Sequence, residues 1–332
     1  MNCPHKPLCK EWKFEALTDI WTGDLSGRSD RLIMTGLLGS IRWWFEVLVR
    51  GLEGYACDPT DKSHRCPSEN VQEATEAGHH CVVCELFGCT GWGRKFRFEV
   101  LTENREIRSN QIKVNETFRL RFTALRPIRT EEWALIDLTM RLISDYGAIG
   151  GKTVFKPSDQ EGRKNKLHHS DFGLVELKED SGVERVSKEE LTDYIKSDKW
   201  RKGNFDDYWA SLKNFWFVEN HYLARKDDKD SSFNRVIGRQ EPKNKAKSLI
   251  REIKGSKWLS GKERESKKVF SFKKLSRTYG FIKRGVIDFD DMQKRLMDVW
   301  ASESFSKDDF KKGEEIIEEI FKKSDCMGGK AE

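Results

Sequence analysis

Alternating apolar and polar residues predict several β-strands in the first half of the chain. Residues 10–18 place large apolar side chains on one side and charged residues on the other, which is the period-two pattern of a strand with one buried face. Residues 94–101 and 117–125 repeat the pattern with phenylalanine and leucine on the apolar side, and residues 172–177 form a shorter candidate. We therefore expect four strands in this half.

Two helices are predicted between these strands by apolar residues at intervals of three and four. Residues 35–51 carry their apolar side chains on one face, with Thr35 as the expected N-cap. A second helix opens at Thr130 and ends at Gly147. Strand, helix, two strands, helix and strand in this order indicate a ferredoxin-like (split βαβ) domain, the architecture also used by RNA-recognition modules.

The second half of the chain has a weaker pattern of the same kind. A capping box predicts a helix that begins after Ser187. Further along, the pattern predicts a strand at residues 269–272 and two closing helices, at residues 292–300 and 310–321, the last opened by a capping box at Ser306.

The composition indicates a soluble, charge-rich protein. Among 332 residues, 37% are hydrophobic and 35% are charged, and 11 tryptophans with 20 phenylalanines can fill a substantial core. No run of about eighteen apolar residues is present, which excludes a membrane-spanning helix. The segment from Met1 to Trp12 lacks the apolar core of a signal peptide, so we expect a cytoplasmic protein with reduced cysteines.

The positive charge is unevenly distributed. The formal net charge is +6, from 61 Lys and Arg residues against 55 Asp and Glu residues. Residues 225–284 contain 20 of the basic residues and 7 of the acidic ones, a local excess of 13. Such a stretch fits either a polyanion or a solvated lysine-rich surface, and charge alone does not decide between them.

Cysteine and histidine residues crowd one segment that lacks hydrophobic periodicity. Residues 52–90 hold five of the 8 cysteines and three of the 7 histidines. Cys81 and Cys84 are separated by two residues, a spacing with which a tight turn presents two thiolates to one zinc ion. Structural zinc needs four ligands, and Cys57 with Cys66 is the expected second pair.

Alternatives to this ligand set remain open. A disulfide framework is the main competing interpretation, and it fits poorly with a cytosolic chain. A site with four protein ligands is closed, so its metal would be structural and would replace the hydrophobic core that this segment lacks. The other candidate ligands in the sequence are His64, His79, His80 and, as a weaker group, Cys3, His5 and Cys9.

A glycine-rich segment, YGAIGGKT at residues 146–153, follows the second predicted helix. Gly151, Lys152 and Thr153 match the end of the P-loop pattern, but Tyr146 stands where the leading glycine belongs. A P-loop also follows a strand and opens a helix, whereas this segment follows a helix, so we expect no nucleotide hydrolysis. The glycines instead allow a phosphate-bearing backbone to approach the main chain.

Three segments of the first half share the features of one known family. They are TGLLGSIRWWFEVLVRG at residues 35–51, CVVCELFG at residues 81–88 and the glycine segment at residues 146–153. Together they resemble the RAMP superfamily of CRISPR-associated proteins and, within it, the subunit-one family of the type III-B (Cmr) effector complex. The resemblance covers residues 10–177 well and the second half weakly, and the family's glycine loop is normally longer and richer in arginine.

The resemblance implies an α+β fold of tandem ferredoxin-like (RRM-like, RAMP) domains with a zinc-stabilised insertion loop and C-terminal helices. In several RAMP subunits the cysteines of the Cys-x-x-Cys turn hold zinc. We expect an N-terminal RAMP domain at residues 1–180 with the cysteine-rich insertion at 52–90. A second, more divergent ferredoxin-like or helical domain is expected at residues 181–332, including the basic stretch at 225–284.

The resemblance further implies a non-catalytic RNA-binding subunit of a type III-B CRISPR ribonucleoprotein that acts in antiviral defence. Its expected partners are the guide RNA near its 3′ end, the target RNA and other RAMP subunits, with no membrane partner. Basic side chains beside the three motifs, together with the loop glycines, are the expected RNA contacts. They are Arg28, Arg31, Arg42, Arg94, Lys95, Gly147, Gly150, Gly151 and Lys152.

Two other functions stay open. Backbone-type RAMP subunits cut target RNA with a loop aspartate near the N-terminus, and Asp24 and Asp30 lie in a comparable loop. His168 and His169 resemble the histidines of guide-processing RAMP proteins, so an endoribonuclease is the first alternative. A zinc-stabilised scaffold without RNA contact is the second, and salt-sensitive RNA binding would distinguish the RNA-binding subunit from it.

Overall fold

The computed structural model of the chain divides into two compact units. Unit 1 consists of residues 1–151, 173–206 and 317–332, and unit 2 consists of residues 152–172 and 207–316. The structure describes residues 8–24, 26–59, 61–152, 157–164, 166–203, 208–227, 230–239, 253–261 and 265–326, without the side chains of 324–326.

The two units interleave along the chain. Residues 152–172 leave unit 1, and the chain returns to it at Gly173, whose carbonyl accepts a hydrogen bond of 2.8 Å from the backbone N–H of Ile149. Residues 181–206, expected from the sequence in the second domain, lie in unit 1. The basic stretch at 225–284 belongs to unit 2 and is described only in part.

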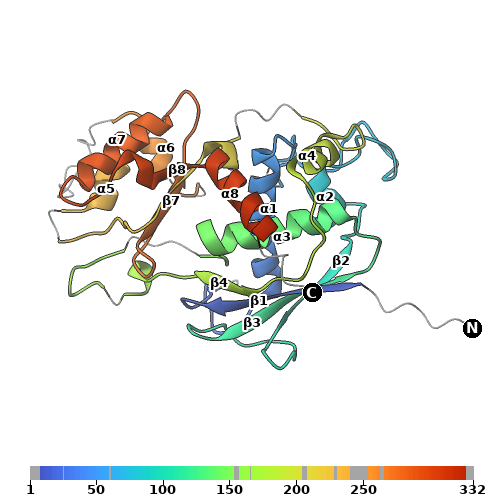
Figure 1. Cartoon of the computed structure of the whole chain (residues 1–332), viewed down its shortest axis with the longest axis horizontal. Coiled ribbons are helices and arrows are strands. Elements are labelled where there is room, and N and C mark those ends of the chain that lie inside the picture. The colour runs from blue at the N-terminus through green and yellow to red at the C-terminus, as the bar shows by residue number, and fades with distance from the viewer. Residues whose placement is uncertain are drawn as a thin grey trace, which may run out of the picture. The chain divides into compact units, whose positions relative to one another are not determined.

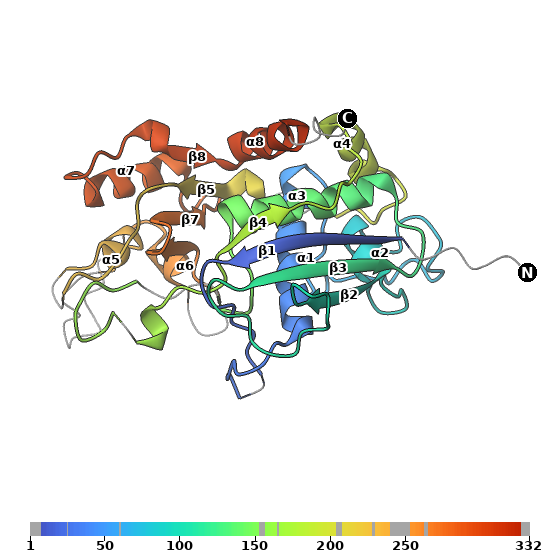
Figure 2. The same ribbon diagram turned by 60° about the horizontal axis from the view of Figure 1, so that its bottom comes forward.

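Unit 1 is a four-stranded antiparallel sheet with two long helices on one face (Figures 1 and 2). The strand order is β2-β3-β1-β4, which is the order of a ferredoxin-like domain and confirms the predicted fold. The elements are β1 (Cys9–Ala16), α1 (Met34–Gly51), β2 (Phe96–Leu101), β3 (Thr117–Ala124), α3 (Thr130–Tyr146) and β4 (Val175–Glu179).

The inner face of this sheet is aromatic, as the alternating pattern predicts. Trp12 and Phe14 on β1 are fully buried, and Phe14 stacks on Phe118 of β3 with ring centroids 5.7 Å apart. The indole N–H of Trp12 donates a hydrogen bond of 2.7 Å to Asp137 on α3. This bond satisfies the one polar atom of a side chain whose burial stabilises the fold by about 2–3 kcal/mol.

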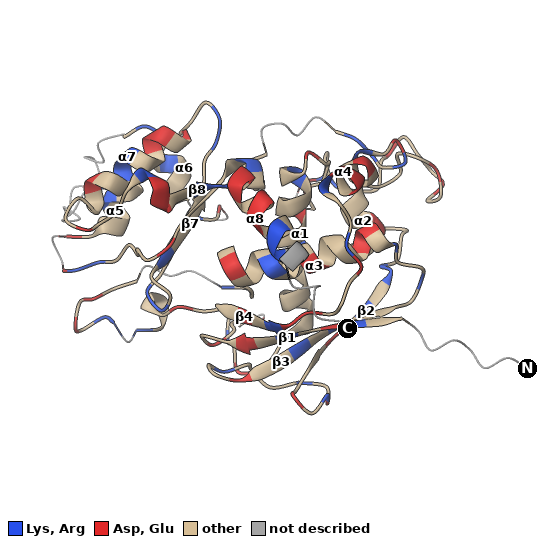
Figure 3. Ribbon diagram, in the orientation of Figure 1, with Lys and Arg blue, Asp and Glu red and all other residues tan. Residues whose placement is uncertain are grey.

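The strands of this sheet carry residues of both charges (Figure 3), and those of its outer face are paired. Arg121 on β3 lies 2.6 Å from Glu11 on β1, and Arg119 lies 2.9 Å from Glu179 on β4. The first pair follows directly from the register, because Glu11 lies opposite Arg121 on the neighbouring strand. The arginines of this face are therefore engaged with carboxylates of the same sheet.

Unit 2 repeats the architecture with a second four-stranded antiparallel sheet. Its strand order is β6-β7-β5-β8, which corresponds strand for strand to β2-β3-β1-β4 of the first sheet. The chain therefore contains two ferredoxin-like sheets, as the tandem fold predicts. The elements are β5 (Phe215–Val218), α5 (Ser232–Val236), α6 (Ser256–Ser260), β6 (Val269–Phe272), β7 (Arg277–Phe281), α7 (Phe289–Val299) and β8 (Phe310–Lys312).

Several predicted boundaries differ from the structure. Helix α1 has Ile33 as its N-cap rather than Thr35. The capping box at Ser306 closes a single 3-10 turn, and residues 310–312, expected to be helical, pair with β5 because Phe310 lies opposite Val218. The remaining elements are α2 (Val82–Phe87), η1 (Leu167–His169), α4 (Lys188–Lys196), η2 (Leu212–Asn214), η3 (Lys307–Asp309) and α8 (Gly313–Cys326). Among the described residues, no helix is long and apolar enough to cross a membrane.

Replacing Gly173 by alanine should destabilise unit 1 strongly. Gly173 has a φ of +77°, and an added Cβ would lie 2.0 Å from the carbonyl oxygen of Ile149. Left-handed strain and the steric overlap together should lower the free energy of unfolding by about 2–4 kcal/mol. Urea unfolding of the full chain, followed by tryptophan fluorescence, measures this loss.

Gly182→Ala is the matched control, because Gly182 has a φ of +56° and nothing within 4 Å of an added Cβ. It should lose about 1 kcal/mol, from backbone strain alone. Equal losses in the two variants would show that the close approach of Ile149 and Gly173 is not a constraint on the fold.

Candidate metal centre and nucleic-acid interface

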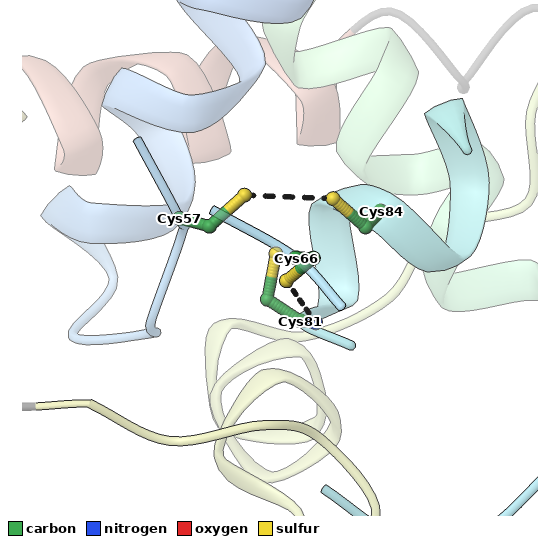
Figure 4. Close-up of side chains that lie close together, drawn as sticks. All are labelled: Cys57, Cys66, Cys81 and Cys84. Carbon is green, nitrogen blue, oxygen red and sulfur yellow. Dashed lines mark hydrogen bonds between the residues drawn. The ribbon is translucent and has the colours of Figure 1, made fainter. Parts of the chain in front are cut away.

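Four cysteines from three parts of the insertion meet in one buried cluster (Figure 4). The sulfur atoms of Cys57, Cys66, Cys81 and Cys84 all lie within 4.8 Å of one another, and none of the four residues is more than 5% exposed. The backbone N–H of Cys81 donates to Sγ of Cys66 at 3.3 Å, and Sγ of Cys57 lies 3.5 Å from Sγ of Cys84. The structure thus brings together the four thiols that the spacing predicts.

The turn that presents Cys81 and Cys84 is shaped by a short helix and a glycine. Cys81 is the N-cap of α2, and Cys84 lies in its first turn. Gly88 ends the helix with a φ of +84°, and a Cβ there would lie 2.9 Å from the backbone nitrogen of Arg94. A side chain at position 88 would overlap the backbone of Arg94. This close approach explains why glycine follows Leu86 and Phe87.

Cys57 is held from the other side by α1. The guanidinium of Arg50, at the end of that helix, donates to the carbonyl oxygens of Ala56 at 3.0 Å and Cys57 at 3.1 Å. Arg50 is also 3.7 Å from Glu46 on the same helix. The helix therefore fixes the backbone that carries Cys57.

The other candidate ligands have different partners. His64 is half-exposed and lies 2.9 Å from Asp61. His79 and His80 are buried, and their Nδ1 atoms lie 2.9 Å apart. Cys89 is half-buried outside the quartet, and Cys9 is exposed on β1. Cys3 and His5 lie outside the described residues.

The quartet has the dimensions of a tetrathiolate site. Four sulfurs at 2.3 Å from a central ion lie roughly 3.8 Å from one another in a regular tetrahedron, which is compatible with the 4.8 Å within which all four sulfurs lie. Burial raises the pKa of the Cys81 thiol, whereas hydrogen bonds from Cys66 and Cys81 lower the pKa of Cys57. With all four ligands supplied by the protein, a metal ion here has no open position for substrate, so the site is structural in kind.

A buried charge network lies directly beside this centre. The ammonium of Lys95, 6% exposed, lies 2.6 Å from Glu85 on α2 and 2.8 Å from Glu132 on α3. Nε2 of His80 lies 2.7 Å from Glu85, and the hydroxyl of Tyr194 on α4 donates to Glu132 at 2.8 Å. Burial alone would raise the pKa of Glu85, but hydrogen bonds from His80 and Lys95 lower it to about 2. The network joins α2, α3 and α4.

Arg42 on α1 also donates hydrogen bonds to residues around the cysteine quartet. Its Nε donates to Glu46 at 2.9 Å, its Nη1 to the carbonyl of Gly88 at 3.1 Å and its Nη2 to Sγ of Cys84 at 3.2 Å. Burial by itself lowers the pKa of this guanidinium, while Cys84 and Glu46 raise it, so the group is charged. Arg42 and Lys95, both expected to contact RNA, are thus placed against protein acceptors, whereas Arg94 is exposed.

The glycine loop packs tightly against α1 and the first loop of unit 1. The backbone N–H groups of Gly147, Gly150 and Gly151 donate to Ile143 O at 3.1 Å, Ser40 Oγ at 3.0 Å and Trp21 O at 2.7 Å. A Cβ at Gly147 would lie 2.6 Å from the ring of Trp44. Gly147 and Gly150 are therefore required for packing, and the amides of all three glycines are engaged within the protein rather than presented to a phosphate.

The remaining predicted contacts are exposed and lie on adjoining loops. Arg28 and Arg31 are exposed on the loop after β1, and Lys152 is exposed at the end of the glycine segment. The two loops adjoin, because a Cβ at Gly151 would lie 3.8 Å from the backbone nitrogen of Gly23. Together with Arg94, these three residues are the cations of the predicted RNA-binding set that the structure leaves at the surface.

The nuclease candidates have structural partners of their own. Oδ1 of Asp24 accepts a hydrogen bond of 2.9 Å from the backbone N–H of Arg28, which lowers the pKa of this carboxyl. Asp30 is exposed in the same loop. The ring of His168 is exposed and lies 4.1 Å from the ring of buried His169. Asp24 is therefore a turn-forming residue in this structure.

Lys95→Met should destabilise the protein far more than Arg94→Met. The first change leaves Glu85 and Glu132 buried without their cation, which should cost about 3–5 kcal/mol. The second removes an exposed charge and should change the free energy of unfolding by less than about 0.5 kcal/mol. Urea unfolding of both full-length variants measures the difference, and similar values would mean that Lys95 is not a structural ion-pair partner.

Comparisons with known proteins agree with this architecture. Residues 13–155 match the family model of the RAMP superfamily. Among solved structures, the chain is similar to the apo form of Cmr1 from Pyrococcus furiosus, with 10% identity, a TM-score of 0.43 and coverage of 92% of this chain and 98% of that one. It is also similar to a Csm3-Csm4 subcomplex of a type III-A CRISPR-Cas interference complex, with 15% identity, a TM-score of 0.25 and coverage of 51% and 74%. No curated protein matches the sequence.

The matched residues begin within β1 and end two residues after the glycine segment, so they include the cysteine quartet and both long helices of unit 1, α1 and α3. The match agrees with the RAMP resemblance of the sequence motifs, and it covers residues 13–155.

Proposed function

We propose that the protein is a non-catalytic RNA-binding subunit of a type III CRISPR ribonucleoprotein effector complex. The observation that carries the proposal is the RAMP match over residues 13–155, on a ferredoxin-like sheet of the kind used for RNA recognition. The subunit-one motifs at residues 35–51 and 81–88 support the assignment to the type III-B group. Guide RNA near its 3′ end, target RNA and other RAMP subunits are the proposed partners.

The proposed RNA contact of unit 1 is the exposed loop after β1. Arg28 and Arg31 supply its positive charge. The paired charges on the outer face of the sheet make that face a weaker alternative, because Arg119 and Arg121 are already matched by carboxylates. RNA on this surface would be held mainly through phosphates.

A non-catalytic role accords with the structure around the acidic loop. Asp24 accepts a backbone hydrogen bond that favours its ionised form and fixes a turn. Its Oδ1 is engaged by the backbone N–H of Arg28 at 2.9 Å, as in an ordinary turn, and on this ground we propose binding without cleavage.

Reversing the charges of the loop surface should weaken RNA binding. The double variant Arg28→Glu, Arg31→Glu should bind single-stranded RNA more weakly. If each residue meets one phosphate, the slope of log K against log[salt] should fall by about 1.4, since each contact contributes roughly 0.7. Fluorescence anisotropy with a labelled RNA at several salt concentrations gives both quantities.

The control carries the same change of charge elsewhere on unit 1. It combines Arg97→Glu and Lys202→Glu, whose side chains are 59% and 61% exposed. Equal weakening by the two double variants would place RNA elsewhere on the protein. Failure of the unmodified protein to bind RNA at low salt would favour the scaffold, and cleaved RNA on a gel would contradict the non-catalytic role.

We further propose that the cysteine quartet holds one structural zinc ion. Four buried thiols at tetrahedral separations suit a soft-ligand ion with four-fold coordination. The ion would supply cohesion to an insertion that has little apolar core of its own, by binding ligands on both sides of residues 58–80. It has no part in a reaction.

The purified protein should contain one zinc ion per chain by elemental analysis. Cys84→Ser should lose it and become more sensitive to proteolysis within residues 52–90, because the cross-link is gone. Cys9→Ser and Cys89→Ser are the controls and should keep the ion, since neither thiol belongs to the quartet. Retention of zinc by Cys84→Ser, or its loss from the Cys89 variant, would contradict the proposed ligand set.

A further inference from the structure

Two arginines from distant parts of unit 1 direct their guanidinium groups at the cysteine quartet. Arg42 on α1 places Nη2 3.2 Å from Sγ of Cys84. Arg201, which follows α4, places Nη1 3.9 Å from Sγ of Cys66. A guanidinium stays charged and has only donors. Its favoured sulfur partner is therefore a thiolate, the form in which cysteine binds a metal.

Both guanidinium groups are oriented by other acceptors. Arg42 is held by Glu46 at 2.9 Å and by the carbonyl of Gly88 at 3.1 Å. Arg201 donates to the carbonyl of Pro67 at 3.4 Å as well as to that of Arg65. Gly88 and Pro67 lie in the turns that follow Cys84 and Cys66. Each arginine therefore contacts one thiol and the backbone of the turn that presents it.

These side chains place positive charge against a filled site. Four thiolates around a divalent ion carry a net charge of −2, which is costly to bury without compensation. The guanidinium groups of Arg42 and Arg201 each contact one of the sulfurs and so offset part of this charge.

We propose that Arg42 and Arg201 are positioning residues for the metal centre, which neutralise and orient the thiolates of Cys84 and Cys66. A bound ion then fastens three segments of unit 1 to one another: α1, the cysteine insertion and the segment after α4. This inference rests on the metal site proposed above. It assigns Arg42 to the metal centre rather than to RNA.

The test compares metal binding by full-length Arg42→Met and Arg201→Met with that of the unmodified protein. Competition with a chromophoric chelator gives the zinc affinity, which should fall by about 10- to 100-fold in each variant. Cobalt substitution supplies a spectroscopic readout, because loss of a hydrogen bond to sulfur should shift the sulfur-to-cobalt charge-transfer band. A general loss of stability would not move that band.

Two further variants keep the outcome decisive. Arg42→Lys and Arg201→Lys keep the charge but lose the planar fork, and should recover part of the affinity. If a methionine variant does not fold, its lysine counterpart gives the comparison. Arg121→Met is the matched control, because Arg121 is 24% exposed in an ion pair on the outer face of the sheet, compared with 22% for Arg42. It should bind zinc as the unmodified protein does.

Each other result would overturn the inference. Zinc affinities of the arginine variants within threefold of the unmodified protein would show that the guanidinium groups do not support the site. Unchanged zinc affinity with weakened RNA binding in Arg42→Met would return Arg42 to the RNA surface. If the unmodified protein itself binds neither zinc nor cobalt, the metal site proposed above has failed, and the role of the arginines fails with it.

Discussion

Helix α1 must match two different buried surfaces at once, and the rest of unit 1 depends on that match. Its apolar face lies in the core, where Trp44 donates to the carbonyl of Ala148 at 2.8 Å and so fixes the glycine loop. Its polar face carries Arg42 and Arg50, which bind the turns of the cysteine insertion. A small rotation of the helix would leave charged groups unpaired on one side and open a cavity on the other, and both are costly.

The two ferredoxin-like sheets have the same strand order, but their cores are filled by different helices and side chains. Unit 1 covers its sheet with two long helices, α1 and α3, whereas the described helices of unit 2 are shorter: α5 and α6 have five residues each and α7 has 11. Large side chains fill much of the described core of unit 2. Trp216, Phe233 and Trp300 belong to one buried cluster, and each brings more apolar area than an aliphatic residue would. The strand order is thus set by the connections between strands, while the filling of the core varies.

The sequence predicts a strand or helix well where one of its faces is exposed to solvent and the other is buried. Strands β1, β2 and β3 alternate cleanly and were predicted to within two residues at each end. Strand β7 was not predicted, because all five of its residues are buried and no alternation remains. Strand β8 has only three residues, and its pairing with β5 overrides the helical pattern that continues into α8. In both cases the deciding contacts come from strands distant in the sequence, which periodicity does not record.

The cysteine quartet was predictable because its chemistry is local, whereas the roles of the nearby cations are not. Arg94 and Lys95 are neighbours, yet one is exposed and the other is buried between carboxylates of α2 and α3. No sequence pattern indicated a role for Arg201, since its thiol partner, Cys66, is distant in the sequence. A cation beside a metal motif can therefore stabilise buried charge or meet a phosphate, and only its acceptors distinguish the two roles. By that criterion Arg42 and Lys95 belong to the interior of unit 1, whereas Arg28, Arg31, Arg94 and Lys152 are exposed.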